Sequence, residues 1–228
     1  MSKSKLFANI SFDFSERRAL VVGGSGGIGR ATAEAFIKSG ATTFCAARNP
    51  PVGLDGAEFI KTDLRQERDI ERLFSVLEEQ GGIDFVVNLA AVNHCKPAEE
   101  ISTNEWNEVL DVNLRGIFLV CQHAARLMKK SGYGRIVNVS SVAGRHRSPV
   151  SGVHYVSSKA GLIGLSRQLS FELAPYGITV NATCPSQTMT DMLRQSMSDK
   201  QISDLERGIP IGRIAQPVEQ VGPILFLC

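Results

Sequence analysis

The sequence predicts an α/β fold of three layers, in which a doubly wound parallel sheet carries helices on both faces. Short apolar runs alternate with longer amphipathic segments along the chain. The runs are apolar at consecutive positions, as in strands that are buried on both faces of a sheet. Parallel strands are joined by right-handed crossovers, so alternating units place helices on both faces. With 228 residues the chain is long enough for one such domain, and we expect a single domain over 1–228.

The expected strands and helices follow from these patterns in order. The first strand, 19–22, ends at a glycine-rich stretch, and the helix after it, 28–39, ends at Gly40, a residue type that suits a helix C-terminus. Further apolar runs predict the strands 42–46, 83–89, 135–139 and 178–183. Further amphipathic segments predict the helices 69–79, 104–130 and 155–175.

Composition and charge predict a globular protein of the cytoplasm. The formal net charge is +2 and the charged residues are scattered, which argues against a nucleic-acid-binding surface. We find neither the apolar run of a secretory signal nor a segment suited to a membrane span. The four histidines lack zinc-ligand spacing, so no metal site is expected. The cysteines are far apart, which favours free thiols in a reducing compartment: Cys45, Cys95, Cys121, Cys184 and Cys228.

Residues 21–30 read VVGGSGGIGR, and their glycines fit two different spacings. A glycine-rich turn between a strand and a helix lets the backbone approach a pyrophosphate, which the N-terminus of the helix attracts. No Lys-Ser/Thr pair follows, which excludes a P-loop. The stretch therefore predicts a dinucleotide site of the Rossmann type. The two spacings are G-x-G-x-x-G through Gly24, Gly26 and Gly29, and G-x-x-x-G-x-G through Gly23, Gly27 and Gly29.

The residues after the second strand indicate which dinucleotide binds. An Asp or Glu at this strand end accepts from the ribose hydroxyls of NAD, whereas a nearby Arg suits the 2′-phosphate of NADP. The strand here ends in Cys45-Ala46-Ala47, without a carboxylate, and Arg48 is the first charged residue. We therefore expect NADP(H) to be preferred, with NAD(H) as the alternative. A solvated Arg48 in a loop is the other interpretation.

A Tyr and a Lys four residues apart open the predicted helix 155–175. At this spacing Tyr155 and Lys159 share one face of a helix, and a serine-rich strand end, Ser140-Ser141, precedes them. A tyrosine has a pKa near ~10, and a nearby ammonium lowers it. We expect Lys159 to lower the pKa of Tyr155, so that the phenol can donate and accept a proton near neutral pH.

From about residue 19 onward, the chain resembles the short-chain dehydrogenase/reductase family, because several motifs occur in the family's order. The loop Gly23-x-x-x-Gly27-Ile28-Gly29 is similar to the family's glycine motif, which favours the second spacing. The other matching positions are Asp63-Leu64, NLAA at 88–91, Asn113 within DVNLRG, the set Ser141, Tyr155 and Lys159, and Pro185 with Thr188 and Thr190.

The resemblance implies an oxidoreductase and a role for each matched residue. Tyr155 would exchange a proton with the substrate, Ser141 would hydrogen-bond the substrate oxygen, and Lys159 would also reach the nicotinamide ribose. Asn113 would hold a water that links Lys159 to solvent. Ser140 competes for the serine role, and the family's pattern favours Ser141. The cofactor-binding set would be Gly23, Ser25, Gly27, Ile28, Gly29, Arg48, Asp63, Leu64, Asn88, Ala90, Tyr155, Lys159, Pro185, Thr188 and Thr190.

Several positions depart from the family's pattern. The chain stops at PILFLC, where family members continue through a loop and one more strand, so the protein is either naturally short or a fragment. If the edge strand is absent, we expect the exposed sheet edge to favour instability or association. Outside the motifs, His94 and His146 are candidates for the substrate pocket. Four replacements of the family's usual residues bear on cofactor affinity rather than on the catalytic set, namely Val22, Leu89, Ala91 and Ser186.

The first functional hypothesis is an NADP(H)-dependent enzyme that interconverts a carbonyl and a secondary alcohol, with a 3-oxoacyl thioester as a candidate substrate. NVSSVAG and GITVNA are most similar to the β-ketoacyl-acyl carrier protein reductase branch, and Lys129 and Lys130 would attract an acidic carrier protein. The alternatives are a polyol, sugar or steroid alcohol dehydrogenase, or a non-catalytic nucleotide-binding regulator. The resemblance also implies a homodimer or homotetramer that pairs through the helices 104–130 and 155–175, with no nucleic-acid or membrane partner.

Overall fold

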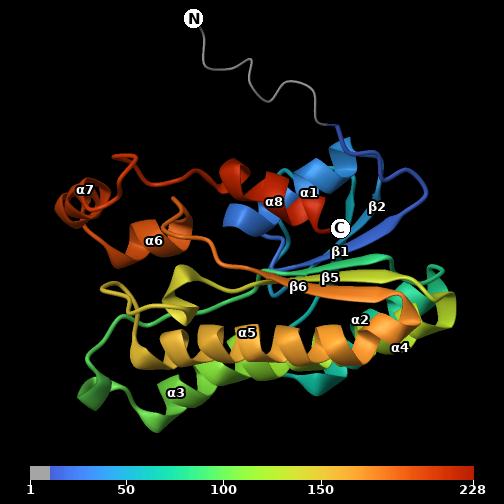
Figure 1. Ribbon diagram of the computed structural model, residues 1–228, viewed down its shortest axis with the longest axis horizontal. Coiled ribbons are helices and arrows are strands. Elements are labelled where there is room, and N and C mark those ends of the chain that lie inside the picture. Colours follow the sequence, from blue (N-terminus) through green and yellow to red (C-terminus); the bar gives the residue numbers. More distant parts are fainter. Residues whose placement is uncertain (1–10) are drawn as a thin grey trace, which may run out of the picture.

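The computed structural model describes residues 11–228, and a six-stranded parallel sheet lies at its centre (Figure 1). The strand order is β3-β2-β1-β4-β5-β6. This order reverses direction between β1 and β4, which opens a crevice at the carboxyl ends of these two strands. The strands are β1 (Arg18–Val22), β2 (Thr42–Ala47), β3 (Ala57–Lys61), β4 (Phe85–Asn88), β5 (Gly134–Val139) and β6 (Ile178–Thr183).

Helices cover both faces of the sheet, which confirms the predicted three-layer fold (Figure 1). α1 (Gly27–Lys38) and α8 (Val221–Phe226) lie on one face. α2 (Glu67–Glu79), α4 (Ile117–Ser131) and α5 (Val153–Leu173) lie on the other. The shorter helices are α3 (Thr103–Leu110), α6 (Asp191–Ser196) and α7 (Asp199–Arg207), with turns η2 (Ala98–Glu100), η3 (Asp111–Gly116), η4 (Val142–Gly144), η5 (Ala174–Tyr176) and η6 (Pro217–Gln220).

Two apolar cores fill the space between these layers, because successive strand residues point to opposite faces of the sheet. Along β1, Leu20 and Val22 join the core under α2 and α4. Ala19 and Val21 join the second core, under α1 and α8. All four side chains are buried, so β1 is apolar at every one of these positions.

Three expectations about the elements need correction. β3 was not among the predicted strands. The predicted helix 104–130 is α3, a π-helical turn η3 and α4, which follow one another without a break. α6, α7 and α8 were also not predicted. β6 forms one edge of the sheet, and the last described element, α8, packs on the α1 face.

Within residues 11–228, none of the helices combines the length and the apolar character that a membrane crossing requires. The same part of the chain contains no group of three His, Cys, Asp or Glu side chains arranged to hold a metal ion.

Candidate active site

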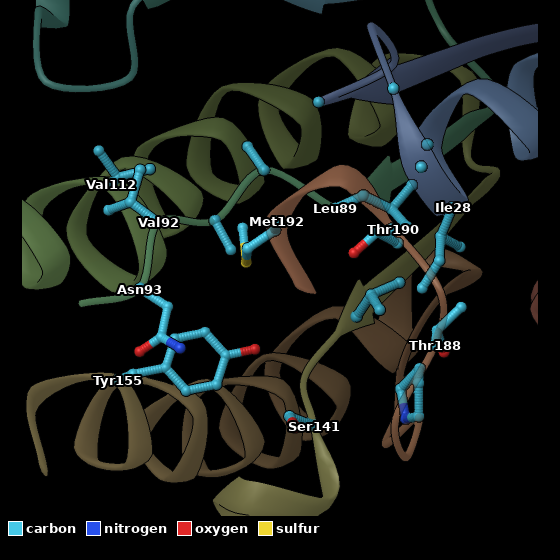
Figure 2. Close-up of a pocket in the computed structure, with 18 of the residues that line it drawn as sticks. Ile28, Leu89, Val92, Asn93, Val112, Ser141, Tyr155, Thr188, Thr190 and Met192 are labelled. Atoms are coloured by element: carbon cyan, nitrogen blue, oxygen red, sulfur yellow. The ribbon is translucent and has the colours of Figure 1, made fainter. Parts of the chain in front are cut away.

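A cavity of about 430 Å³ lies at the carboxyl ends of the central strands, where the strand order reverses. Open α/β sheets bind their ligands at this place. Its walls are the glycine-rich loop, the ends of β2, β4 and β5, the first turns of α5, and residues 185–193. Figure 2 shows this cleft, with Ile28 and Thr188 at one side and Tyr155 and Asn93 at the other.

The glycine-rich loop has little room for side chains at three positions. Gly23 has a φ of +88°, and a Cβ there would lie 2.6 Å from the backbone nitrogen of Ala90. A Cβ on Gly29 would lie 2.1 Å from the carbonyl oxygen of Gly23. Gly27 has a φ of +51°, and its Cβ would lie 3.0 Å from Cγ2 of Thr190. These three residues form the G-x-x-x-G-x-G spacing.

The two remaining glycines differ from each other. A Cβ on Gly26 would have no atom within 4 Å, so glycine is not required there for space. A Cβ on Gly24 would lie 2.7 Å from Sγ of Cys45, which makes Gly24 necessary for packing onto β2. The steric demand of the loop therefore favours the second spacing, with Gly24 as an additional constrained position.

The N-terminus of α1 fits the pyrophosphate of a dinucleotide. Its N-cap residue, Gly26, offers no side-chain cap, and the first turn contains no acidic residue. The first N–H groups of a helix have no intrahelical acceptors, and the helix dipole makes this end positive. Because Gly26, Gly27 and Ile28 also line the cleft, an anion there meets open backbone N–H groups.

The end of the cleft beside β2 contains the residues that the sequence predicts to bind adenosine. Arg48 is exposed directly after β2, and both Arg48 and Ser25 line the cavity. Leu64 is buried at the same end. Asp63 accepts hydrogen bonds from Arg65, including one of 2.6 Å from Nη2, and these bonds lower the pKa of the carboxyl group, an effect opposed by burial.

Asn88 is a predicted cofactor residue whose side chain does not line the cleft. Its Nδ2 donates a bond of 2.8 Å to Oδ1 of Asn138, deep between β4 and β5. Ala90, two residues on, does line the cleft, and its backbone N–H donates to the carbonyl oxygen of Val22 at 2.9 Å. Asn88 thus ties two central strands together, and the chain after it turns into the cavity wall.

Ser141, Tyr155 and Lys159 meet on the opposite wall. In Figure 2 the hydroxyl of Tyr155 points into the cavity and Ser141 lies on the same side. Nζ of Lys159 donates a bond of 2.9 Å to the carbonyl oxygen of Val139 and lies 5.7 Å from the centre of the Tyr155 ring. β5 and α5 therefore bring together three residues that span 19 positions of sequence.

The pKa of Tyr155 is shifted in the direction opposite to our expectation. Burial raises the pKa of the phenol, and a hydrogen bond with the Ser141 side chain opposes this only in part. Burial also lowers the pKa of Lys159 to about 8. The expected lowering by Lys159 does not prevail because the low polarity of the site disfavours both charged forms. At neutral pH the phenol is therefore protonated and able to donate.

The hydroxyl of Ser140 is engaged away from the cavity centre. Its Oγ is buried and donates a bond of 2.7 Å to the backbone carbonyl of Lys159. The hydroxyl of Ser141 instead accepts from the backbone N–H of Ala143 at 3.1 Å and can still donate its own proton. Ser140 thus fixes α5 on β5, and Ser141 is the serine with a donor for a ligand.

Asn113 lies in the π-helical turn η3 and does not line the cleft. Its Oδ1 accepts from the backbone N–H of Val92 at 2.8 Å. Its Nδ2 donates to the carbonyl oxygen of Val92 at 2.9 Å and to Oγ of Ser158 at 3.1 Å. The fully buried amide therefore holds the chain after β4 against α5.

The segment after β6 closes the cleft from the side. Pro185, Thr188 and Thr190, three of the residues predicted to bind the cofactor, line it. Thr188 pairs with Ala215 in a single parallel bridge, and the side chain of Thr190 accepts from the backbone N–H of Leu193 at the start of α6.

Several lining residues had no signal in the motifs. Sequence reasoning could not place them, because they come from loops and from the unpredicted α6. His94 and His146 are not among the lining residues, and Nε2 of His94 lies 3.2 Å from Oε2 of Glu108. The lining residues not predicted include Asn93, Val150, Ser151, Gln187 and Met192.

The fold and this site define a class of nucleotide-dependent oxidoreductases, and sequence comparison identifies the family. The sequence profile of the short chain dehydrogenase family matches residues 17–201. The chain belongs to this family.

Curated relatives carry several different activities in their names. The 3-oxoacyl-[acyl-carrier-protein] reductase FabG of Aquifex aeolicus is 37% identical over 222 residues, which cover 92% of this chain and 89% of that protein. A 3beta-hydroxysteroid dehydrogenase of Mediterraneibacter gnavus is 38% identical, with coverage of 82% and 71%. A D-threitol dehydrogenase of Mycolicibacterium smegmatis is 33% identical, with coverage of 96% and 89%.

Solved structures share the same fold. A candidate NAD(P)-dependent gluconate 5-dehydrogenase from Beutenbergia cavernae, with NADP bound at low occupancy, is 32% identical with a TM-score of 0.88, covering 96% of this chain and 92% of that one. A short chain dehydrogenase from Leptospira borgpetersenii with bound NAD+ is 31% identical with a TM-score of 0.87, covering 94% and 86%. The chain is therefore an NAD(P)-dependent oxidoreductase that acts on CH–OH groups.

Proposed function

We propose that this protein is an NADP(H)-preferring enzyme that interconverts a ketone and a secondary alcohol through Tyr155. One observation carries the proposal: the hydroxyls of Tyr155 and Ser141 face the same cavity as the open N-terminus of α1. A hydride donor bound along the glycine loop and a carbonyl bound at the two hydroxyls would share this cavity. A non-catalytic regulator has no need of a proton donor at that place.

The protein's part in the reaction follows from the state of each group. Bound NADPH would supply the hydride. Tyr155, whose pKa is raised by burial, would donate its proton to the carbonyl oxygen, and Ser141 would donate a hydrogen bond to the same oxygen. Lys159, with a pKa of about 8, still holds its proton at pH 7 and would compensate the charge of the phenolate after the transfer.

The preference for NADP(H) rests on Arg48. The β2 strand ends without a carboxylate, and the exposed guanidinium of Arg48 is the first charged group at the adenosine end of the cleft. A guanidinium matches the geometry of a phosphate, whereas a carboxylate at this position would repel one.

For the substrate, the 3-oxoacyl thioester class is our first choice, supported by the reductase from Aquifex aeolicus. The alternatives are polyols, sugars or steroids, supported by the names of other relatives. Lys129 and Lys130 give the thioester little support within one subunit. Both end α4 just before β5 begins, at the amino edge of the sheet, and the cleft lies at its carboxyl edge. Lys129 also lies over the Tyr176 ring at 3.9 Å.

We further propose that two or four copies pair through α4 and α5. Phe118 on α4 and Phe171 on α5 keep 39% and 78% of their surface exposed in the single chain, which is costly in water. Light scattering coupled to gel filtration tests this, since a monomer at micromolar concentration would contradict it.

A substrate panel tests the function directly. NADPH oxidation would be followed with an acetoacetyl thioester, a ketose and a 3-ketosteroid, for the wild type and for Tyr155→Phe. We expect turnover of at least one ketone, and a fall in kcat of about 10³-fold in the variant, with the Kd for NADPH changed less than about twofold. NADPH binding without any turnover in the wild type would favour the regulator, and full activity of Tyr155→Phe would overturn the assigned role.

A further inference from the structure

His154 is a fully buried histidine directly before Tyr155, and the chemistry above makes no use of it. Its Nδ1 accepts a bond of 2.9 Å from the backbone N–H of Tyr155. α5 begins at Val153, and its N-cap, Gly152, contributes no side-chain acceptor. The first N–H groups of a helix need such an acceptor, which Ser, Thr, Asp or Asn commonly supplies. In α5 the imidazole of His154 supplies it instead.

The carbonyl of the same residue is also held by a side chain. Oγ of Ser158 donates a bond of 2.7 Å to the backbone oxygen of Tyr155. Ser158 in turn accepts from Nδ2 of Asn113 at 3.1 Å. Both peptide groups of Tyr155 are therefore fixed by neighbouring side chains, so the direction of the phenol depends on these contacts.

The position of the His154 ring is determined by close packing. A Cβ on Gly152 would lie 2.5 Å from Cε1 of His154 and 2.5 Å from the backbone oxygen of His94. The φ of Gly152 is −71°, which any residue can adopt. Glycine is thus needed here for space, and the space is taken by the ring and by the chain after β4.

We propose that His154 is a positioning residue for proton transfer: its neutral ring holds the first turn of α5 so that the Tyr155 hydroxyl faces the cleft, and a protonated ring releases this turn. The inference rests on the role proposed for Tyr155. An Nδ1 that accepts a hydrogen bond places the proton of the neutral ring on Nε2. Protonation of Nδ1 removes the lone pair that the Tyr155 N–H requires.

The surroundings keep the ring neutral under ordinary conditions. Burial is the main cause that lowers the pKa of His154, and the charges of His94 and Lys96, on the chain after β4, act in the same direction. The Gly152 backbone and Glu105 of α3 act in the opposite direction. Glu108, also on α3, is paired with His94. On its own helix the His154 ring faces the Tyr155 N–H. The dipole of α5 also disfavours a protonated, positively charged ring at this N-terminus.

Two substitutions separate the effect of the hydrogen-bond acceptor at His154 from the effect of protonating its ring. In His154→Asn, the amide Oδ1 takes the position of Nδ1 and accepts the same N–H, but it does not titrate. In His154→Leu, the shape is roughly kept and the acceptor is lost. His123→Asn is the matched control, because His123 lies on α4, stacked on Phe74 at 5.4 Å between ring centres.

The measurement is kcat, KM and the Kd for NADPH against pH, with the ketone that the panel identifies. Because the pKa of His154 is lowered, we expect kcat of the wild type and of His123→Asn to fall only at pH values below the ordinary histidine pKa. We expect His154→Asn to lose this acid limb while it keeps most of its kcat at neutral pH. We expect His154→Leu to lower kcat on the order of tenfold at every pH, with the NADPH Kd within about twofold of wild type.

An unchanged acid limb in His154→Asn, or an unchanged kcat in His154→Leu, would overturn the inference. If His154→Leu does not fold, the pH profile of His154→Asn decides alone. A purely structural role would lower Tm without changing the pH profile of kcat. Failure of the proposed function is recognised separately, because Tyr155→Phe would then retain its turnover.

Discussion

The tightest contact in the nucleotide loop predicts the effect of one methyl group. In Gly29→Ala, the added carbon would lie 2.1 Å from the carbonyl oxygen of Gly23. Carbon and oxygen atoms that are not bonded rarely approach closer than ~3.3 Å, so the loop and the start of α1 must separate by about 1 Å. Both atoms at the clash belong to backbone or Cβ positions, which cannot turn away as a flexible side chain can.

This clash affects both stability and ligand affinity. Overpacking of this kind costs about 1–3 kcal/mol, and the better helix propensity of Ala returns at most ~1 kcal/mol. For a chain of this size, a net loss of about 1–2 kcal/mol corresponds to a fall in Tm of roughly 2–8 °C. The same displacement moves the N–H groups at the start of α1, so we expect the Kd for NADPH to rise on the order of tenfold or more.

Gly26→Ala is the matched control, three residues away in the same loop. Its φ of −162° is ordinary extended backbone, and a Cβ there would have no atom within 4 Å. We expect Tm within about 1 °C and Kd within about twofold of wild type. Kd would be measured by quenching of the single Trp106 or by calorimetry, and Tm by scanning fluorimetry. Equal losses in the two variants, or none in Gly29→Ala, would refute the steric reasoning and reopen the choice of glycine spacing.

Three other substitutions test separate parts of the site. Lys159→Met should abolish turnover yet stabilise the fold at pH 7 by up to about 3 kcal/mol, because the folded-state pKa of Lys159, about 8, lies below the ordinary 10.5. Between pH 8 and 10.5 the unfolded wild type binds more protons than the folded wild type, so the wild type gains stability as pH rises. The gain in Tm that the variant shows should therefore shrink over this pH range. Asn88→Leu should lower the free energy of unfolding by about 1–3 kcal/mol, since it leaves the buried Oδ1 of Asn138 with only a weak bond from Sγ of Cys121, and denaturant titration would show this. Arg48→Ala should reduce the ratio of kcat/KM for NADPH over NADH by about tenfold, and an unchanged ratio would remove Arg48 from cofactor selection.

The sequence predicted the sheet well where strands are buried on both faces. All residues of β4 are buried, and the run stands out as apolar. β3 is an edge strand in which only Ile60 is buried, so its residues, AEFIK, have no apolar run to find. α7 was missed for a similar reason, since it has no buried residue.

The candidate site was predicted through spacing, and the errors concern environment. The spacing of four residues from Tyr155 to Lys159 identifies a shared helix face, but it contains no information about burial. The pKa of Tyr155 is governed by burial, so its direction could not be derived from the neighbouring ammonium alone. The direction of the Asn88 side chain likewise depends on Asn138, which is 50 residues away in sequence and adjacent only in the folded sheet.

The π-helical turn η3 makes the number of residues in Asp111–Gly116 structurally important. A π-helical turn contains one residue more than an α-helix would hold, and such turns often arise at functional sites. Because the widened turn accommodates the extra residue, deleting one residue from Asp111–Gly116 would leave a regular α-helix with α3 and α4 close to their present alignment. Glu105 and Glu108 on α3 would then keep their partners, whereas Asn113, which lies inside the widened turn, would lose its hydrogen bonds with Val92. The extra residue of η3 therefore serves the placement of Asn113 against Val92 rather than the alignment of the two helices that the turn joins.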